Sequence, residues 1–385
     1  MKKLSKLMLA AVASVALAAP AFAWDFSASG SSSAKWMTRT TNSGVEGASA
    51  ITSAAFSSSA GGITLSSSNS DGANSATFSY TNDYNSDSDA LNYDEYVSIS
   101  GSKKVGNWTA SSSTTQYMQK DSTAGTPMTG NGSASITLTD GSITYKLGDA
   151  AHLSTAEKTV NGPMDGQVDS EARVDAFDGF SVGLGVGPGT LTVALDMNTD
   201  GDLFGDRGIA IACGGQSTGY GLNFAGDVGA DLSFTFGTGS TAPSAAGCTG
   251  DNASNAASAT TMGLGVAIPM GDIHIALDYE STSWNNTAET EETKNTLSGF
   301  EISVTMGGIA DGTAGINISS NATSVTVGTG DAAKGTGSGT ELWWTVPIGP
   351  VSLAVGYGSD SYTTGSDTKV TVVDTQMGAE MSMSF

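Results

Sequence analysis

Residues 180–197 read FSVGLGVGPGTLTVALDM. Large apolar residues occupy every second position on both sides of Gly187-Pro188-Gly189, and the positions between them hold Ser, Gly, Thr, Ala or Asp. Alternation with a period of two predicts strands with one apolar and one polar face, and the Gly-Pro-Gly sequence predicts a tight turn between them. The stretch therefore predicts a β-hairpin.

The same alternation recurs along the chain, in residues 220–224, 232–236, 262–268, 273–279, 300–306 and 351–357. In each run the intervening positions are small or polar, so no second apolar face is left for another sheet to pack on. A soluble β-sandwich would have shorter strands and an apolar side richer in bulky residues. The pattern favours an all-β transmembrane antiparallel barrel, whose strands face lipid on one side and water on the other.

Turn signals between the strands alternate in length, as such barrels require. We expect short turns at 60–62, 103–107, 140–141, 187–189, 225–229, 269–271, 307–312 and 347–350. Long polar connections are expected at 81–92, 120–131, 150–170, 199–216, 238–259, 281–295, 320–338 and 359–369. Eight hairpins give sixteen strands, and an unpaired strand at each end makes eighteen. The Ser-rich hairpin at 51–70 carries the weakest signal, which leaves sixteen open.

The composition excludes several classes of function. Among the 385 residues, Asp and Glu number 38 against 15 Lys and Arg, for a formal net charge of −23. Nucleic-acid binding needs basic patches, which this balance does not supply. His152 and His274 are the only histidines, and their spacing fits no metal-binding motif. We predict no enzymatic activity and no cofactor.

The first 23 residues have the three parts of a secretory signal peptide. Lys2, Lys3 and Lys6 form a positive region, residues 7–19 are an apolar run, and Ala21-Phe22-Ala23 is a cleavage pattern. The apolar run is shorter than the ~18 residues of a membrane-spanning helix. We expect an exported chain that begins at Trp24, with residues 24–385 forming one barrel domain.

The end of the chain is an amphipathic strand that closes on an aromatic residue. Met381, Met383 and Phe385 share one face of this strand. The arrangement resembles the C-terminal signal that the outer-membrane barrel assembly machinery reads. The signal usually has Gly five residues before the end, where this chain has Glu380.

Two central stretches resemble Gram-negative outer-membrane diffusion porins. Residues 132–150, GSASITLTDGSITYKLGDA, are similar to the hairpin before the inward-folded third loop of that family, and residues 170–186, SEARVDAFDGFSVGLGV, to the strand and turn after it. The resemblance implies passive diffusion of small hydrophilic solutes and ions across the Gram-negative outer membrane, a homotrimer, and a constriction formed by residues 150–170. From composition alone, residues 150–170 would be a long exposed loop.

Strand alternation places several charged side chains on the lumen side. Lys146 is opposite in parity to Tyr145 and Leu147, and Lys35 and Arg39 are opposite to Trp36. The same parity turns Glu171, Arg173, His274 and Asp278 inward. Glu157, Asp165 and Asp169 lie in the loop that the resemblance folds inward. Basic residues on the wall and acidic residues on the loop would hold a transverse field across a constriction, and charge rings in narrow pores set ion preference.

Other acidic residues and the two cysteines fall in the long connections. Asp87, Asp89, Asp94 and Glu95, like Asp200, Asp202 and Asp206, form acidic clusters that favour a solvated loop over a Ca²⁺ or Mg²⁺ site. Their charge predicts a preference for cations at low salt. Cys213 and Cys248 lie in consecutive connections of an exported chain, which permits a disulfide between them.

Two alternatives to a diffusion channel stay open. The first is a structural or adhesive surface barrel, in which the acidic Ser/Thr/Gly connections are the working part. The second is a substrate-specific channel with aromatic residues along the lumen, and few aromatic residues have inward parity.

Overall fold

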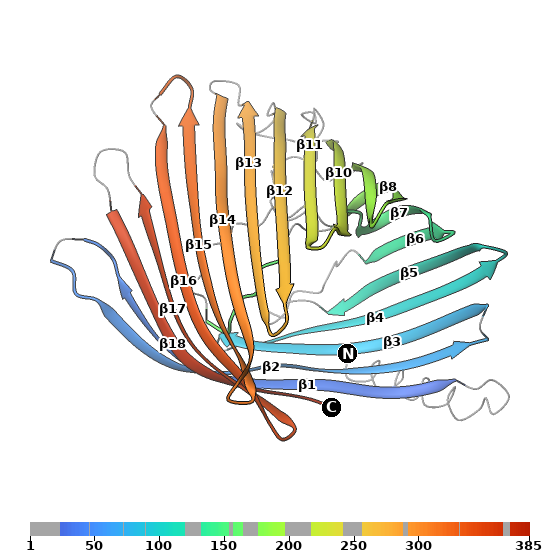
Figure 1. Cartoon of the computed structure of the whole chain (residues 1–385), viewed down its shortest axis with the longest axis horizontal. Helices are drawn as coiled ribbons and strands as arrows, with labels where there is room; N and C mark the ends of the chain where they lie inside the picture. The colour runs from blue at the N-terminus through green and yellow to red at the C-terminus, as the bar shows by residue number, and fades with distance from the viewer. Residues whose placement is uncertain are drawn as a thin grey trace. The chain divides into compact units, whose positions relative to one another are not determined.

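The structure is a computed structural model that describes residues 24–45, 47–71, 73–88, 90–119, 132–153, 157–164, 176–196, 217–241, 256–287, 292–330, 332–364 and 370–385. These residues are almost entirely in long β-strands (Figure 1). None of them forms a helix long and apolar enough to cross a membrane.

The strands number eighteen among the described residues. Their bounds are β1 (Asp25–Asn42), β2 (Ile51–Ser70), β3 (Asn74–Ser88), β4 (Ala90–Val105), β5 (Trp108–Gln119), β6 (Ser133–Thr139), β7 (Ile143–Ala151), β8 (Ala176–Val186), β9 (Gly189–Asp196), β10 (Ser217–Asp227), β11 (Asp231–Thr241), β12 (Ala256–Met270), β13 (Ile273–Thr287), β14 (Glu292–Ile309), β15 (Gly312–Val327), β16 (Ala333–Ile348), β17 (Val351–Thr364) and β18 (Val370–Ser384).

Strands adjacent in sequence are adjacent in the sheet, and β1 pairs with both β2 and β18. The fold is a closed antiparallel β-barrel, as the alternation predicts, with the larger of the two expected strand numbers. By their contacts the described residues group into two compact units. The first unit takes its residues from 1–33, 59–140 and 383–385, and the second from 34–58 and 141–382.

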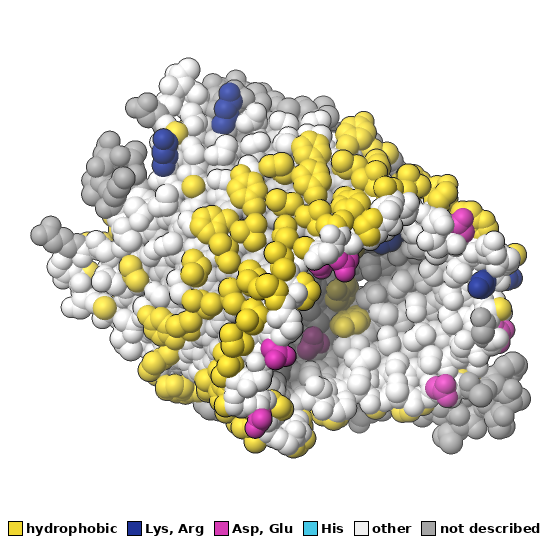
Figure 2. Space-filling model, viewed as in Figure 1, with side chains coloured by type: hydrophobic (Ala, Val, Ile, Leu, Met, Phe, Trp, Pro, Cys, Tyr) yellow, Lys and Arg dark blue, Asp and Glu magenta, His cyan; other side chains and the backbone are white. Residues whose placement is uncertain are grey.

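In the second unit the two faces of the strands differ as a membrane barrel requires. Large apolar side chains such as Phe180, Val193 and Leu342 are exposed on one face, while polar side chains such as Asn223 and Glu341 are buried on the other. Figure 2 shows hydrophobic side chains gathered in a broad area over β12–β17. The apolar face is the lipid-facing surface, and the polar face lines the interior.

The short turn expected at 60–62 is wrong, because these residues lie inside β2. The chain reverses instead between β2 and β3, where the Asp71 carboxylate accepts hydrogen bonds from the backbone N–H of Ala73 (3.0 Å) and Asn74 (2.6 Å). Such an Asx turn fixes a tight reversal without Pro. Hydrogen bonds from the Asn74 side chain and from these backbone groups hold the pKa of Asp71 below its usual value.

Several of the expected long connections are shorter than predicted. Residues 81–88 and 90–92 belong to β3 and β4, and residues 320–327 and 333–338 belong to β15 and β16. Ser, Thr and Asn dominate these segments, so they carry no apolar alternation. Backbone pairing continues through them because a strand outside the hydrocarbon layer needs no apolar face.

The last residue pairs with the first strand inside the first unit. Phe385 N donates to Gly30 O (2.9 Å), and Gly30 N donates to Phe385 O (2.8 Å). A Cβ atom added at Gly30 would lie 2.5 Å from Cζ of the Phe385 ring, so glycine is required there. Met381, Met383 and Phe385 are exposed on the lipid-facing side.

Candidate functional site

The inward-facing side of the second unit carries a set of buried carboxylates that we call the carboxylate wall. Its members are Asp196 of β9, Asp278 and Glu280 of β13, Glu301 of β14, Glu341 of β16, Asp360 of β17 and Asp374 of β18. Among the residues that the structure describes, no Lys or Arg is buried in the same way. This wall is therefore acidic.

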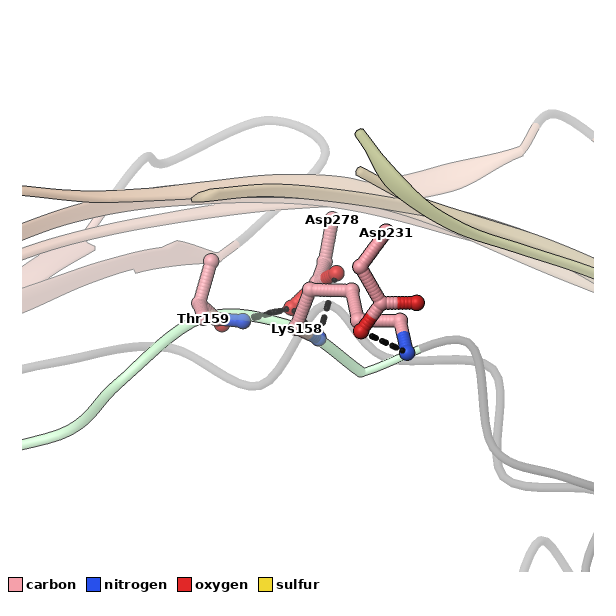
Figure 3. A network of polar contacts seen from close by, with 4 residues as sticks. All are labelled: Lys158, Thr159, Asp231 and Asp278. Atoms are coloured by element: carbon pink, nitrogen blue, oxygen red, sulfur yellow. Dashed lines mark hydrogen bonds and ion pairs between the residues drawn. The ribbon is translucent and has the colours of Figure 1, made fainter. Parts of the chain in front are cut away.

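The segment 157–164, which follows β7, lies against the carboxylate wall. Both oxygens of the Asp278 carboxylate accept from Lys158 N at 2.8 Å, and Oδ2 also accepts from Thr159 N (2.7 Å) and Thr159 Oγ1 (2.6 Å). The Lys158 ammonium forms an ion pair with Asp231 at 2.9 Å. Figure 3 shows both carboxylates pointing from the strands toward the segment. One strand carboxylate thus satisfies two successive backbone N–H groups.

The rest of the segment is held by three further strands. Val160 N donates to Ser303 Oγ of β14 (2.9 Å), and Asn317 Nδ2 of β15 donates to Asn161 Oδ1 (2.6 Å). The Glu341 carboxylate of β16 accepts from Gly162 N (2.8 Å) and Met164 N (2.5 Å).

These contacts leave few backbone donors of the segment without a partner on the wall. Hydrogen bonds to ionised acceptors are roughly twice as strong as neutral ones. The segment is consequently fixed to the inner surface from β13 to β16.

Apolar contacts reinforce this attachment. Met164 is fully buried, and a Cβ atom added at Gly356 of β17 would lie 3.0 Å from its Cγ. A Cβ atom at Gly162 would lie 2.6 Å from Glu341 Oε1 and 2.7 Å from the Trp343 ring. Glycine at these positions lets the segment and the wall approach closely, and Trp343 is an inward-facing aromatic residue.

A histidine fixes the point where the chain leaves β7. His152 Nε2 lies 2.7 Å from Gly148 O, and its Nδ1 lies 2.9 Å from Ser181 Oγ of β8. The neutral tautomer with hydrogen on Nε2 donates to the carbonyl and accepts from the hydroxyl. The Phe177 ring packs against the imidazole, with 4.7 Å between centroids. Burial lowers the pKa of His152, so this neutral form is favoured.

Of the residues predicted to line a constriction, four are described. Lys146 Nζ donates to Ala151 O (2.6 Å) at the end of β7, and Arg39 forms an ion pair with Asp374 at 2.7 Å. Lys35 is half-buried and Glu157 is exposed. Asp165, Asp169, Glu171 and Arg173 lie outside the described residues, as do Cys213 and Cys248.

Sequence reasoning missed most of the residues that hold the segment. It turned Asp278 inward by parity but assigned no role to Asp231, Ser303 or Glu341, nor to Glu301, which accepts from the Asn317 side chain. Parity alone would have placed Glu301 between Phe300 and Ile302, and Glu341 before Leu342, on the inner face. The available signal was a single carboxylate in the middle of an otherwise neutral strand, which indicates an inward residue with a polar partner.

The inward-facing side of the first unit has a different composition, and we call it the hydroxyl wall. Every inward position is Ser or Thr at 27–33 of β1, 64–70 of β2, 75–81 of β3, 98–102 of β4, 109–115 of β5 and 133–139 of β6. The outward positions of the same strands include Phe26, Ile63, Ile99 and Ile136, all exposed. This wall is polar and uncharged over those ranges.

Within the described residues no group of three or more His, Cys, Asp or Glu side chains could hold a metal ion. Of the acidic clusters, Asp200, Asp202 and Asp206 lie outside the described residues, and so do the side chains of Asp87, Asp89 and Asp94. The Glu95 carboxylate accepts a short hydrogen bond from the Tyr80 hydroxyl.

No family model and no curated protein matches the chain. Among solved structures it is similar to an anion-selective porin from Comamonas acidovorans, with a TM-score of 0.53 and 9% identity over 94% of this chain and 100% of that one. It is also similar to the outer membrane channel DcaP of Acinetobacter baumannii (TM-score 0.53, 11% identity, 94% and 97% coverage). OmpT, an outer membrane protein of Vibrio cholerae in trimer form, gives 0.51 at 9% identity, with 94% and 100% coverage. The chain has the fold of outer-membrane porins.

Proposed function

We propose that this chain is an outer-membrane porin that forms a water-filled channel for passive diffusion of small hydrophilic solutes and ions, with a preference for cations. The observation that carries the proposal is that the barrel strands have an apolar outer face and a polar inner face, with segment 157–164 attached to the inner face. Lipid-facing apolar residues place the strands in a bilayer. A polar inner face with a segment attached to it is suited to a narrowed aqueous path.

Residues 150–170 are the constriction loop in this proposal. The hydrogen bonds of Asp278 and Glu341 support it, because they attach residues 158–164 to inward-facing side chains. Glu157 is exposed beside this attachment, which supports its proposed role as an acidic residue of the constriction. Lys35, Arg39 and Lys146 on the strands, with Asp165, Asp169, Glu171 and Arg173, complete the proposed charge ring.

The cation preference rests on the charges of this chain. The carboxylate wall has no buried basic counterpart among the described residues, and the whole sequence carries a formal charge of −23. Confined charges act over distances at which exposed ones are screened by salt. One protein of similar structure is an anion-selective porin, so the shared fold does not determine the sign of the preference.

We further propose export by the signal peptide of residues 1–23 to the Gram-negative outer membrane, and assembly as a homotrimer. The trimer form of the similar Vibrio cholerae protein supports the assembly. We propose no enzymatic activity. His152 and Ser181 are within hydrogen-bond distance, but they are only 4% and 3% exposed, which leaves no approach for a substrate carbonyl.

Planar-bilayer recording of the purified protein tests the proposal. We expect stepwise conductance, and a reversal potential in a salt gradient that favours cations and weakens as the salt rises above ~0.1 M. An absence of steps would favour a structural or adhesive barrel, and saturable block by a single solute would favour a substrate-specific channel. A reversal potential of the opposite sign would remove the cation preference and leave the channel.

A further inference from the structure

The hydroxyl wall is ordered in rows that cross several strands. In the strand register, one residue from each of five adjacent strands lies directly opposite a residue of the next strand. These residues form the row Ser66, Ser79, Ser98, Thr115 and Ser133. Two residues further along each strand, a second row has the same composition. Neighbouring strands lie about 4.8 Å apart, and successive rows about 6.8 Å apart. The wall is therefore a regular array of hydroxyl groups.

Several of these hydroxyls are paired across strands. The oxygen–oxygen distance is 2.7 Å for Ser27–Ser66, 3.0 Å for Thr64–Thr81 and 2.8 Å for Ser98–Thr115. A hydroxyl has one donor and two acceptor sites, so a pair that shares one hydrogen bond keeps both a donor and acceptors for a third group. The two oxygens are spaced like those of a vicinal diol, and such a pair can bind a diol at both of its oxygens.

Within the residue ranges of the hydroxyl wall this face carries no charged residue, and the nearest ones lie just outside those ranges, with Lys35 following Ser33 in β1. Asp25 begins β1, Lys104 precedes the turn at 106–107, and Asp83 lies beyond Thr81 in β3. Between them the face offers hydrogen bonds without net charge. An ion gains little from such a surface in exchange for its hydration shell, whereas a neutral solute with many hydroxyls exchanges water hydrogen bonds for equivalent ones at many points.

We infer that the hydroxyl wall is a path for uncharged polyhydroxylated solutes such as sugars and sugar alcohols. This inference rests on the proposed channel function and names a solute class for it. Successive rows give the solute a series of similar weak sites. A series of this kind favours permeation, because conduction needs binding that is favourable enough to enter and weak enough to leave.

The test is liposome swelling with two neutral probes of nearly equal mass, a hexitol with six hydroxyls and tetraethylene glycol with two. The variant Thr64→Val/Thr81→Val/Thr115→Val removes hydroxyls from the wall with little change of shape, and Val is well accepted in strands. The matched control is Thr114→Val, because Thr114 is exposed on the lipid-facing side of the same strand as Thr115. Thr114 Oγ1 also makes a hydrogen bond, to Ser133 O at 3.1 Å, so the control removes a bonded hydroxyl too.

We expect the hexitol to enter faster than the glycol in the unmodified protein. The triple variant should reduce the hexitol-to-glycol ratio about fivefold, as for the loss of about one net hydrogen bond, and the control should leave it unchanged. Thr115→Ser, which keeps the hydroxyl, should leave the ratio intact as well.

An unchanged ratio in the triple variant, or equal losses in the triple variant and the control, overturns the inference even though ionic conductance persists. A protein that conducts no ions overturns the proposed channel and the inference with it. The ratio is internal to each preparation, so a variant that folds in lower yield still gives a valid reading.

Discussion

The carboxylate wall and the hydroxyl wall have the same strand alternation, but their inward side chains form different hydrogen bonds. Carboxylates such as Asp278 and Glu341 accept from the backbone N–H groups of segment 157–164 and hold it in place. Hydroxyls such as Ser98 and Thr115 pair with one another across strands. Ser303 shows that a hydroxyl can also accept from the segment, but a hydrogen bond to an ionised carboxylate is roughly twice as strong as one to a neutral group. The two regions therefore differ in the charge of their inward side chains and not in the geometry of their strands.

The largest expected effect comes from removing the charge that holds the segment. In Asp278→Asn/Glu341→Gln the shape is kept while several charge-assisted hydrogen bonds are weakened, at a cost of about 3 kcal/mol. Amide hydrogen exchange at Lys158, Thr159, Gly162 and Met164 should then accelerate about 100-fold. Mass spectrometry of the protein in nanodiscs measures this.

Asp272→Asn is the control for that variant, because Asp272 lies in the exposed turn before β13. It removes one negative charge and touches no part of segment 157–164. Protection of the four amides that stays at the wild-type level in the double variant would show that the carboxylates do not hold the segment.

A second prediction moves charge onto the neutral wall. Ser113 of β5 is directly opposite Ser100 of β4, at the centre of the uncharged region. Ser113→Lys should change the cation-to-anion permeability ratio about twofold toward anions, as expected for one charge roughly 10 Å from an ion in water and partly screened by salt. The control is Thr109→Lys, which places the same charge on the same strand but near the turn at 106–107. Ser112→Lys is unsuitable because it would expose the charge to lipid. Equal shifts at positions 113 and 109 would mean that the centre of the hydroxyl wall is not part of the ion path.

Acid should act on the second unit through His152 and leave the hydroxyl wall unchanged. The pKa of His152 is lowered in the folded protein, chiefly by burial, so its contribution to stability is present above the pKa of the unfolded chain and is lost as the pH falls through the folded value. In His274→Gln, which leaves one histidine, an NMR titration should give a pKa for His152 below that of a free imidazole. A titration at or above the free value would contradict the neutral tautomer between Gly148 O and Ser181 Oγ. The hydroxyl wall has no group that titrates in this range at its centre, so its solute ratio should stay constant.

Most of the fold was predictable because the lipid-facing and inward-facing residues of a membrane barrel alternate along each strand with a period of two. The runs around Phe180, Leu191, Ile275 and Phe300 gave the strands and their orientation correctly. The turn at 60–62 was wrong because two glycines inside β2 resemble a turn signal, whereas the real turn depends on the Asp71 side chain. Strand ends were underestimated where Ser and Thr replace apolar residues outside the hydrocarbon layer.

The site was less predictable because it depends on contacts between residues far apart in sequence. Parity turned Asp278 inward, but nothing local shows that its partner is the backbone of Lys158 and Thr159, 120 and 119 residues away. Lys146 and Arg39 were predicted as pore charges, and the structure pairs them with Ala151 O and Asp374. The hydroxyl wall was present in the sequence as a Ser-rich composition, and the strand register was needed to order it into rows.

The smallest expected effect concerns the one ion pair of segment 157–164 that reaches solvent. The Lys158 ammonium lies 2.9 Å from Asp231, whose side chain is 53% exposed. Exposed pairs of this kind contribute about 0.2–1 kcal/mol and weaken with salt. Lys158→Met keeps the aliphatic stem and the backbone N–H that Asp278 accepts, so exchange of the Lys158–Met164 amides should accelerate less than fivefold, and the difference from wild type should vanish in 1 M salt. An effect as large as that of Asp278→Asn/Glu341→Gln would mean that the side-chain ion pair, and not the backbone donors, attaches the segment to the carboxylate wall.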